Sequence, residues 1–321
     1  MGFLKRRALT YLSVLLVSVN LDFFLPRLAP SNAAELLAAG SKLPYKEATL
    51  IAHRLGLNTP LPTQYYLYLK NIFLTWPPYF GSSYQYYPTT VTDLFFSRLG
   101  WTLLLIIPSF LIASLLAYLL AAAGTLRPAG KFETGTIYSS ILLQGLPPFW
   151  IAMVFLWVFA VRLHLVPMFG AANLNASGLN LGLSILQHSL LPILVLSISL
   201  LGEDYLLLRA STVEVLKTDY VTSAKARGLS DRRISFDYIL RNSLIPFVSL
   251  TSFSVASLIS RVVVIESVFG YPGVGDLLVD ATFNRDFPVL VGSFFFITIL
   301  TVIGGMMGDV VLLKLDPRLR G

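Results

Sequence analysis

The sequence predicts an all-α polytopic membrane protein with six transmembrane helices. Of its 321 residues, 55% are hydrophobic and only 13% are charged, whereas a soluble domain carries about 25% charged residues. The mean hydropathy is +0.72. A helix of about 20 apolar residues crosses a bilayer core about 30 Å thick. Stretches of this kind lie at 8–25, 99–123, 136–161, 188–208, 245–267 and 288–313.

The distribution of positive charge orients these six helices. A cytosolic N-terminus places loops 124–135 and 209–244, and the tail after residue 313, on the cytosolic side. That side then holds 15 of the 24 Lys and Arg residues, and the two short outer loops hold only Arg162 and Arg285. Short loops are where the positive-inside rule discriminates. We therefore expect a multi-pass protein of the plasma (inner) membrane with both termini cytosolic, and the charge of +7 requires no nucleic-acid partner.

The first helix, with the cytosolic N-terminus, covers residues 1–25. Lys5-Arg6-Arg7, an apolar run and Ser31-Asn32-Ala33 leave a cleaved signal peptide as an alternative. The apolar run to Leu25 is long, however, and Pro26-Arg27 separates it from the small residues. This spacing favours a retained membrane helix.

Residues 26–97 are predicted to form an extracytoplasmic segment, because they are too polar and Pro-rich to span a membrane. Their aromatic residues predict either a small folded cap, with rings in its own core or at the membrane interface, or a surface that receives a partner or substrate. These aromatics include Tyr65, Tyr66, Tyr68, Trp76, Tyr79, Tyr84, Tyr86 and Tyr87. Residues 98–313 then form the transmembrane core, and 314–321 a cytosolic tail.

Several motifs that would indicate an enzyme or a cofactor site are incomplete. The chain has no Cys, and its three His residues are too widely spaced to predict a metal site. Gly124 and Gly130 stand one residue too far apart for a phosphate loop, and Phe132 occupies the place of its Ser or Thr. The 270–275 segment lacks the third glycine of a dinucleotide fingerprint. We expect neither catalysis nor a bound cofactor or metal.

Ionisable residues inside the apolar stretches are costly and often functional. Glu203 and Asp204 form either a proton or cation site, as an ion-coupled secondary transporter would need, or a pair with a nearby base or the cytosolic interface. Arg261 and Glu266 are expected to pair with each other or with neighbours. Asp309 is expected to serve packing or the interface.

Small residues recur at roughly helical spacing in three of the stretches. They are Ser249, Ser252, Ala256 and Ser260; Ala113, Ala117 and Ala121; and Gly304 and Gly308. Such residues let helices pack closely in lipid, so packing is the first interpretation. A Ser stripe that lines a translocation path is the alternative.

The charged segment from Asp219 to Pro246 separates two apolar stretches. Residues around Ala224 favour a helix, Gly228 suits the left-handed cap conformation, and Ser230 suits the start of a second helix. A basic helical hairpin between two membrane helices is suited to docking into a groove on a soluble partner.

This segment resembles the "EAA" loop of ABC importer permeases, and more narrowly the B-type permease subunit of the oligopeptide/dipeptide/nickel branch. The resemblance is carried by Asp219-Tyr220-Val221, Ala224-Lys225-Ala226-Arg227-Gly228-Leu229-Ser230, Arg232-Arg233 and Leu240-Arg241-Asn242-Ser243-Leu244-Ile245-Pro246. Thr222-Ser223-Ala224 stands where Glu-Ala-Ala would open the general motif. That departure is usual in this branch.

The resemblance extends along nearly the whole chain. It includes Leu55-Gly56-Leu57-Asn58, Pro60-Leu61-Pro62, Gly81-Ser82-Ser83-Tyr84, Arg98-Leu99 with Thr102, Leu146-Pro147-Pro148-Phe149-Trp150, Glu266-Ser267-Val268-Phe269, Pro272-Gly273-Val274-Gly275, Asn284-Arg285-Asp286 and Leu315-Asp316-Pro317-Arg318. Arg261 and Glu203-Asp204 depart from the branch, where small or apolar residues are usual.

The resemblance implies a non-catalytic subunit of an ATP-driven importer. Its partners would be a sister permease, two cytosolic ABC ATPases that hold ATP and Mg, an extracytoplasmic substrate-binding protein, and membrane lipid. The implied coupling residues are Asp219, Tyr220, Ala224, Lys225, Ala226, Arg227, Gly228, Leu229, Ser230, Arg232, Arg233 and Pro246. Ser249, Ser252 and Ser260 are candidates for the translocation path.

Other functions remain as alternatives at this point. Besides the secondary transporter, the basic hairpin mimics a DNA-binding helix-turn-helix, and the aromatic outer segment would suit a membrane-anchored sensor. Peptides are the first candidate cargo, with oligosaccharides or a chelated metal as alternatives.

Overall fold

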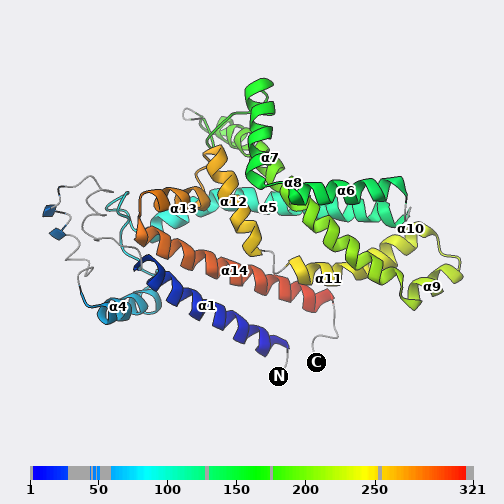
Figure 1. The fold of residues 1–321 in the computed structure, drawn as a ribbon, viewed down its shortest axis with the longest axis horizontal. Helices are drawn as coiled ribbons and strands as arrows, with labels where there is room; N and C mark the ends of the chain where they lie inside the picture. The colour runs from blue at the N-terminus through cyan, green and yellow to red at the C-terminus, as the bar shows by residue number, and fades with distance from the viewer. Residues whose placement is uncertain are drawn as a thin grey trace. The chain divides into compact units, whose positions relative to one another are not determined.

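Helices are the regular secondary structure of the residues that the computed structural model describes, together with one isolated bridge between Ser82 and Thr90 (Figure 1). The described residues are 3–27, 44, 46–47, 49–50, 59–126, 130–173, 176–251 and 255–315. The all-α prediction is confirmed for these ranges.

The helices follow one another in the order that the apolar and charged stretches predict. They are α1 (Phe3–Arg27), α4 (Leu61–Phe73), α5 (Val91–Leu126), α6 (Lys131–Gly145), α7 (Pro148–Phe155), η1 (Leu156–Arg162), α8 (Leu179–Leu216), α9 (Asp219–Ala226), α10 (Asp231–Arg233), η2 (Ile234–Leu240), α11 (Arg241–Thr251), α12 (Val255–Phe269), α13 (Val274–Phe283) and α14 (Phe287–Leu315).

Four uninterrupted helices, α1, α5, α8 and α14, are long and apolar enough to cross a membrane. Two further pairs meet the same criteria together but are sharply bent, so the described residues contain from four to six candidate spans. The first pair, 131–145 with 148–162, bends by 98°. We expected a continuous helix over 136–161, and the structure breaks it at Leu146, because the residue before a proline is disfavoured in the helical region.

The fifth predicted stretch, 245–267, includes residues 252–254, which lie outside the described residues. The described parts on either side, α11 to Thr251 and α12 from Val255, are both helical. The bent pair in this region joins 257–269 to 274–283, at an angle of 76°. The apolar run therefore continues through α13, beyond the predicted end.

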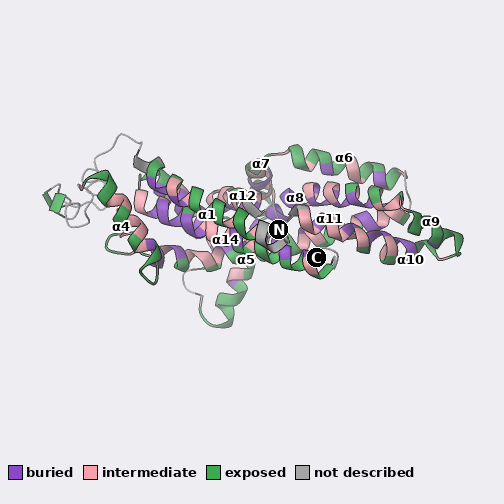
Figure 2. Ribbon diagram, turned by 90° about the horizontal axis from the view of Figure 1, so that it is seen from below, coloured by how far each residue is buried: buried purple, intermediate pink, exposed green. Residues whose placement is uncertain are grey.

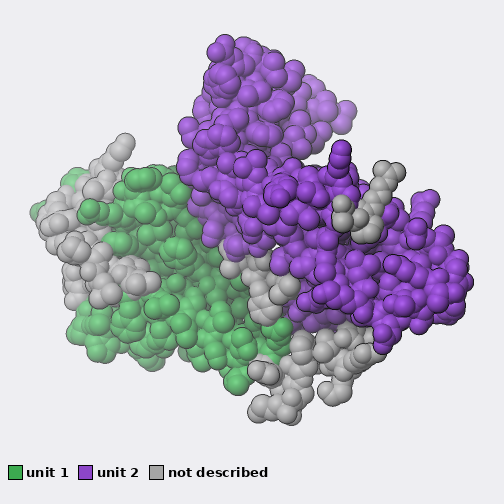
Figure 3. Space-filling model, turned by 45° about the vertical axis from the view of Figure 1, so that its right-hand side comes forward, with its two compact units in different colours: residues 1–101, 272–303 green, residues 102–271, 304–321 purple. Residues whose placement is uncertain are grey.

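The chain divides into two compact units, shown in separate colours in Figure 3. Residues 1–101 and 272–303 form unit 1; residues 102–271 and 304–321 form unit 2. The core of unit 1 joins α1, α4, α5 and α14 through Val19, Ile72, Phe95 and Phe296. The rings of Phe95 and Phe296 stack with centroids 4.8 Å apart.

Polar contacts in unit 1 hold the segment before α5 against the segment around α13. The Ser83 hydroxyl donates to the buried Asp286 carboxylate, and the Tyr86 hydroxyl donates to Asp280 at 2.7 Å. Burial, and then the hydrogen bond to Asp280, raises the pKa of Tyr86 to about 12. Two motif segments that are far apart in sequence, at 81–84 and 284–286, therefore meet in this unit.

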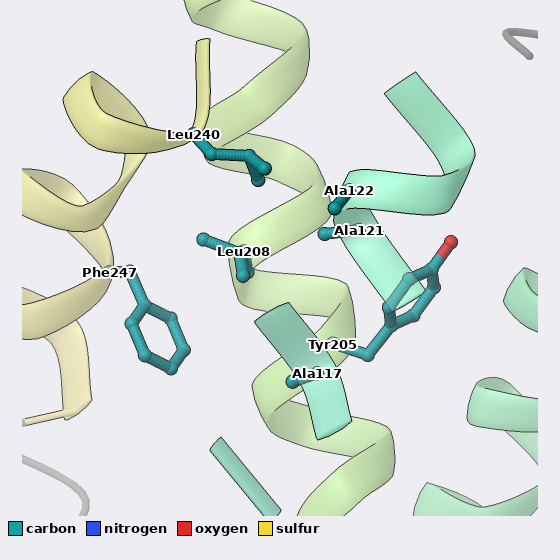
Figure 4. Packing of buried hydrophobic residues seen from close by; sticks show 7 residues of the cluster. All are labelled: Ala117, Ala121, Ala122, Tyr205, Leu208, Leu240 and Phe247. Carbon is teal, nitrogen blue, oxygen red and sulfur yellow. The ribbon is translucent and has the colours of Figure 1, made fainter. Parts of the chain in front are cut away.

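The core of unit 2 packs α5, α8 and α11 together (Figure 4). Ala117 and Ala121 on α5 are fully buried, which confirms the packing interpretation of the alanine stripe. Their small side chains leave room for Tyr205 and Leu208 on α8. Phe247 on α11 completes the contact. This cluster connects the membrane helices of unit 2 to the charged hairpin.

Candidate functional site

The charged hairpin of unit 2 begins with α9, ends that helix at a glycine, and returns through α10, η2 and α11. Gly228 has φ +72°, in the left-handed region. The Leu229 N–H donates to the Ala224 carbonyl at 3.4 Å, and the Gly228 N–H donates to Lys225 at 2.9 Å. This hydrogen-bond pair is the Schellman arrangement that ends helices at a glycine. The predicted helix, glycine turn and second helix are therefore present.

An apolar core holds the two arms of the hairpin together. Val221 and Ala224 on α9 are buried against Ile234 and Ile239 on η2, and Leu229 packs against the same cluster. Contact between the residue after the glycine cap and the preceding helix commonly accompanies the Schellman arrangement. The hairpin is thus an internally packed element.

The outer surface of the hairpin carries most of the predicted coupling residues. Asp219, Tyr220, Lys225, Ala226, Arg227, Gly228, Ser230, Arg232 and Arg233 are exposed (Figure 2). A shallow groove on the returning arm is lined by Ser230, Arg232, Arg233, Phe236 and Asp237. The face that a soluble partner can reach is therefore mainly basic.

Three members of the predicted set lie elsewhere. Ala224 is fully buried, and Leu229 and Pro246 are half-buried. Ala224 and Leu229 belong to the core of the hairpin, whereas Pro246 lies inside α11. Ser230 stands at the start of α10, but its side chain forms no capping hydrogen bond. The expected side-chain cap is absent, and the Ser230 carbonyl accepts the Ile234 N–H at 3.0 Å instead.

Polar contacts join the helices near the hairpin. Arg209 on α8 forms an ion pair with Glu133, a buried residue at the start of α6. The hydroxyls of Thr125 on α5 and Ser235 on η2 are hydrogen-bonded to each other. No pattern in the sequence predicted these two contacts. The only signal for the ion pair was one acid and one base at the expected cytosolic ends of two apolar stretches.

The intramembrane ionisable residues of unit 2 form a set of pairs. Arg261 on α12 donates to Glu203 on α8 at 2.5 Å and to the Ser199 carbonyl at 2.7 Å. Ser114 on α5 donates to the buried Asp204 at 3.1 Å. Pairing with a base, one of the alternatives for Glu203 and Asp204, is observed for Glu203, whereas Asp204 contacts a serine.

Arg261 and Glu266 share no ion pair within the described residues. Arg261 binds Glu203, whereas Glu266 is fully buried and accepts a hydrogen bond from Thr102 on α5 at 2.7 Å. Both residues therefore contact other helices, as the alternative of pairing with neighbouring residues predicted.

The serine stripe is only partly described. Ser249 is half-buried in α11, and Ser260 is exposed on α12 beside Arg261. Ser252 lies outside the described residues, as do Arg318 and Arg320 of the predicted cytosolic tail.

Nearly the whole chain is similar to known membrane transport proteins. Residues 113–321 match the family described as "Binding-protein-dependent transport system inner membrane component". Residues 1–106 match the N-terminal part of such a membrane component. The oligopeptide transport system permease protein AppB of Bacillus subtilis is 29% identical over 99% of each chain. The permease proteins OppB of Haemophilus influenzae and of Escherichia coli K12 are 30% and 28% identical, again over 99% of each chain.

The family match covers well over half of the chain, and the similarity to the curated permeases extends along nearly its full length. This chain therefore belongs to the family of inner-membrane components of binding-protein-dependent transport systems, and it is a non-catalytic, multi-pass permease subunit of an ABC importer.

Proposed function

We propose that this permease subunit forms half of a translocation path for peptides and drives it through the hairpin Asp219–Pro246. The cargo is inferred from relatives described as oligopeptide permeases, which match 99% of this chain. A sister permease supplies the other half of the path, and an extracytoplasmic binding protein delivers the peptide. ATP and Mg are held by two cytosolic ATPase partners.

The proposed topology has six spans and cytosolic termini. Each bent pair then counts as one span, which makes six with the four uninterrupted helices. The charge bias supports this orientation, since the hairpin exposes Lys225, Arg227, Arg232 and Arg233 on what becomes the cytosolic side. Residues 1–25 contain the first span, 26–97 the outer segment and 98–313 the core, with the coupling loop at 209–246 and a cytosolic tail at 314–321.

The packing of the hairpin and its position between two membrane helices are the observations that support this proposal most directly. Its two arms pack on each other, its basic residues point outward, and both ends continue into membrane helices. A stiff element of this kind suits docking into an acidic groove on an ATPase. The long-range attraction between basic and acidic surfaces also steers the encounter.

The route by which force reaches the membrane begins at the two arms. The returning arm contacts α8 through Leu240, and Phe247 contacts the same cluster from α11. A displacement of α9 by the closing ATPases would therefore move α8 and α11 together, since close-packed interiors transmit strain. Ser249, Ser252 and Ser260 would lie along the path at the interface with the sister subunit.

The left-handed turn at Gly228 offers the test of this proposal. A residue with a Cβ in this conformation costs about 1–2 kcal/mol, and only Gly, Asn or Asp adopts it routinely. No atom lies within 4 Å of the position that a Cβ would occupy, so only backbone strain is at issue. Gly228→Val should change the turn, while Gly228→Asn should retain it.

The experiment uses the assembled transporter with its ATPase, sister and binding-protein partners in proteoliposomes. The Gly228→Val variant should insert and hydrolyse ATP but lose most peptide uptake, whereas Gly228→Asn should retain most of it. Wild-type uptake by a Gly228→Val transporter would refute the coupling role. Ion-gradient dissipation serves as a further control, since uptake should continue as long as ATP is supplied.

A further inference from the structure

The short helix α4 of unit 1 carries large apolar or aromatic side chains on both of its faces. Its sequence, LPTQYYLYLKNIF, contains a single charged residue, Lys70. Tyr65, Tyr68, Leu69 and Ile72 recur at helical spacing and form the face toward the unit's core. Contiguous exposed apolar surface commonly marks a site of contact with a partner or a membrane, so we ask what covers the outer face of α4.

Among the residues that the structure describes, none covers the outer face of α4 (Figure 2). Only Ile72 is buried among the thirteen residues of the helix. Tyr66 and Phe73 are 64% and 62% exposed, and the exposure continues past the helix end with 76% at Leu74 and 93% at Trp76. The exposed residues from Leu61 to Trp76 are aromatic, aliphatic or proline, apart from Thr63, Lys70 and Thr75.

Contacts with α1 fix the depth of α4. The Tyr68 hydroxyl donates to the Val19 carbonyl at 3.2 Å, and Tyr65 donates to the Asn20 side chain at 2.8 Å. The Tyr65 ring lies 5.0 Å from that of Phe23. The apolar window of α1 ends at residue 24, so Val19 lies about 8 Å inside that end, at 1.5 Å per residue. The tyrosines of α4 therefore reach into the depth of the membrane span.

The exposed face of α4 is continuous with the lipid-facing surface of α1. Near the same end of α1, Val17, Leu21 and Phe24 are about half exposed, as side chains facing lipid are expected to be. The ring of Phe24 stacks on Tyr65, with centroids 5.7 Å apart. One apolar surface thus extends from a membrane span onto α4.

We propose that α4 and the following residues through Trp76 lie in the plane of the membrane, at the outer boundary between headgroups and acyl chains. Lipid is the cover of the exposed face. Amphipathic or apolar helices bury about 5–10 Å into this boundary, a depth that matches the contact at Val19. Tyr66 and Trp76 are residue types enriched there, and the long Lys70 side chain can extend its ammonium group to water.

With α4 at the membrane boundary, the outer segment would lie partly in lipid and partly in water. The external binding protein is the alternative cover. A soluble protein that binds reversibly would be expected to dock on a face with more polar and charged groups than the exposed face of α4 carries. Anchoring α4 in lipid would hold the outer end of α1 at a fixed height. The proposal depends on the proposed function only for calling this surface the outer one.

The absence of cysteine in the 321 residues allows clean labelling of single sites. We would place a nitroxide at Leu74→Cys and, as a matched control in the same unit, at the exposed residue Glu47→Cys. The transporter would be reconstituted in phosphatidylethanolamine and phosphatidylglycerol vesicles. The label at position 74 should collide several-fold more often with oxygen than with a water-soluble nickel chelate, and the label at position 47 should show the reverse.

A second measurement uses the native tryptophan. Replacing Trp101, Trp150 and Trp157 by Phe leaves Trp76 as the only indole of this chain, which is reconstituted for this measurement without its partners. Its fluorescence should be quenched by lipids brominated at a shallow acyl position, and less by deeply brominated lipids or by iodide.

Three outcomes would overturn the proposal. They are nickel accessibility at position 74 equal to that at position 47, stronger quenching by the deep bromolipid, and protection of position 74 that appears only when the binding protein is added. Uptake is not part of either readout, so a failure here is distinguishable from a failure of the coupling role.

Discussion

The contact between α6 and α8 depends on the absence of a side chain at Gly202. A Cβ at this position would lie 2.6 Å from the Ser140 carbonyl oxygen and 3.2 Å from the Gln144 nitrogen, both backbone atoms of α6. Leu143 Cβ would lie 3.3 Å away. Glycine lets the two helices approach this closely, as small residues do throughout membrane proteins. Gly202→Ala should therefore separate α6 from α8.

The size of the effect can be worked out from these distances. Ordinary contact with the Ser140 oxygen begins at 3.4 Å, so the backbones must separate by about 0.8 Å. A backbone carbonyl cannot rotate away as a flexible side chain can. Overpacking of this kind costs about 1–3 kcal/mol, while alanine gains about 1 kcal/mol over glycine within a helix. The net change of a single variant therefore mixes two effects of opposite sign.

The matched control is Gly100→Ala in the middle of α5, where a Cβ would meet no atom within 4 Å. Both substitutions gain helix propensity, so their difference isolates the contact. We expect Gly202→Ala to unfold with a free energy about 1–3 kcal/mol lower than that of Gly100→Ala, measured by the same unfolding assay in one bicelle composition. Equal free energies for the two variants would show that α6 and α8 do not meet at this position.

Two further predictions concern single polar contacts. Arg261→Met and Glu203→Gln should each destabilise unit 2 by about 2 kcal/mol, below the 3–5 kcal/mol of a fully buried pair, because the side chains remain 20% and 25% exposed. The double variant should recover at least about 1 kcal/mol of their sum, and strict additivity in this cycle would contradict the ion pair. Tyr86→Phe should remove from the alkaline difference spectrum a phenol that ionises near pH 12. Since the pKa of Tyr86 is raised from 10.0, its contribution to the free energy of unfolding should be complete below pH 10 and lost as the pH rises toward 12. If Tyr86→Phe instead removes a phenol that ionises near pH 10, the burial of Tyr86 against Asp280 is refuted.

The features that local chemistry determines were predictable from the sequence. Hydropathy and length located the apolar stretches that became α1, α5, α8 and α14. The glycine at position 228 predicted the left-handed turn, because few other residues adopt that conformation. Pro147 and Pro148 signalled a break within 136–161, but the apolar run on both sides concealed it.

The contacts that depend on tertiary packing were not predictable. Arg261 and Glu203 form a contact although they are 58 residues apart in the sequence, and Thr102 and Glu266 are 164 residues apart. The period of an apolar helix shows which residues share a face, but it does not show which other helix that face contacts. The position of α4 was missed for a related reason. Its aromatic residues predicted either a small folded cap, with rings in its core or at the membrane interface, or a surface for a partner or substrate, and the hydrogen bonds to α1 could not be read from the sequence.

The distribution of contacts along α8 bears on how the hairpin could act. Arg209, four residues beyond Tyr205 toward the hairpin, ties α8 to α6; Asp204 ties it to α5, and Glu203 ties it to α12. The apolar cluster around Leu208 adds α11. A force applied at α9 would therefore reach four helices through α8 within two turns.

Ionised contacts are the more specific links in this set, because an ion pair depends on orientation and distance whereas apolar packing tolerates sliding. Arg261→Met should therefore have two separable effects. Loss of stability should accompany any disruption of the ion pair, but a reduced ratio of peptide uptake to ATP hydrolysis is expected only if α12 receives its motion from α8. Restoring stability with the double variant while the ratio stays low would assign the ion pair a role in transmission beyond its role in folding.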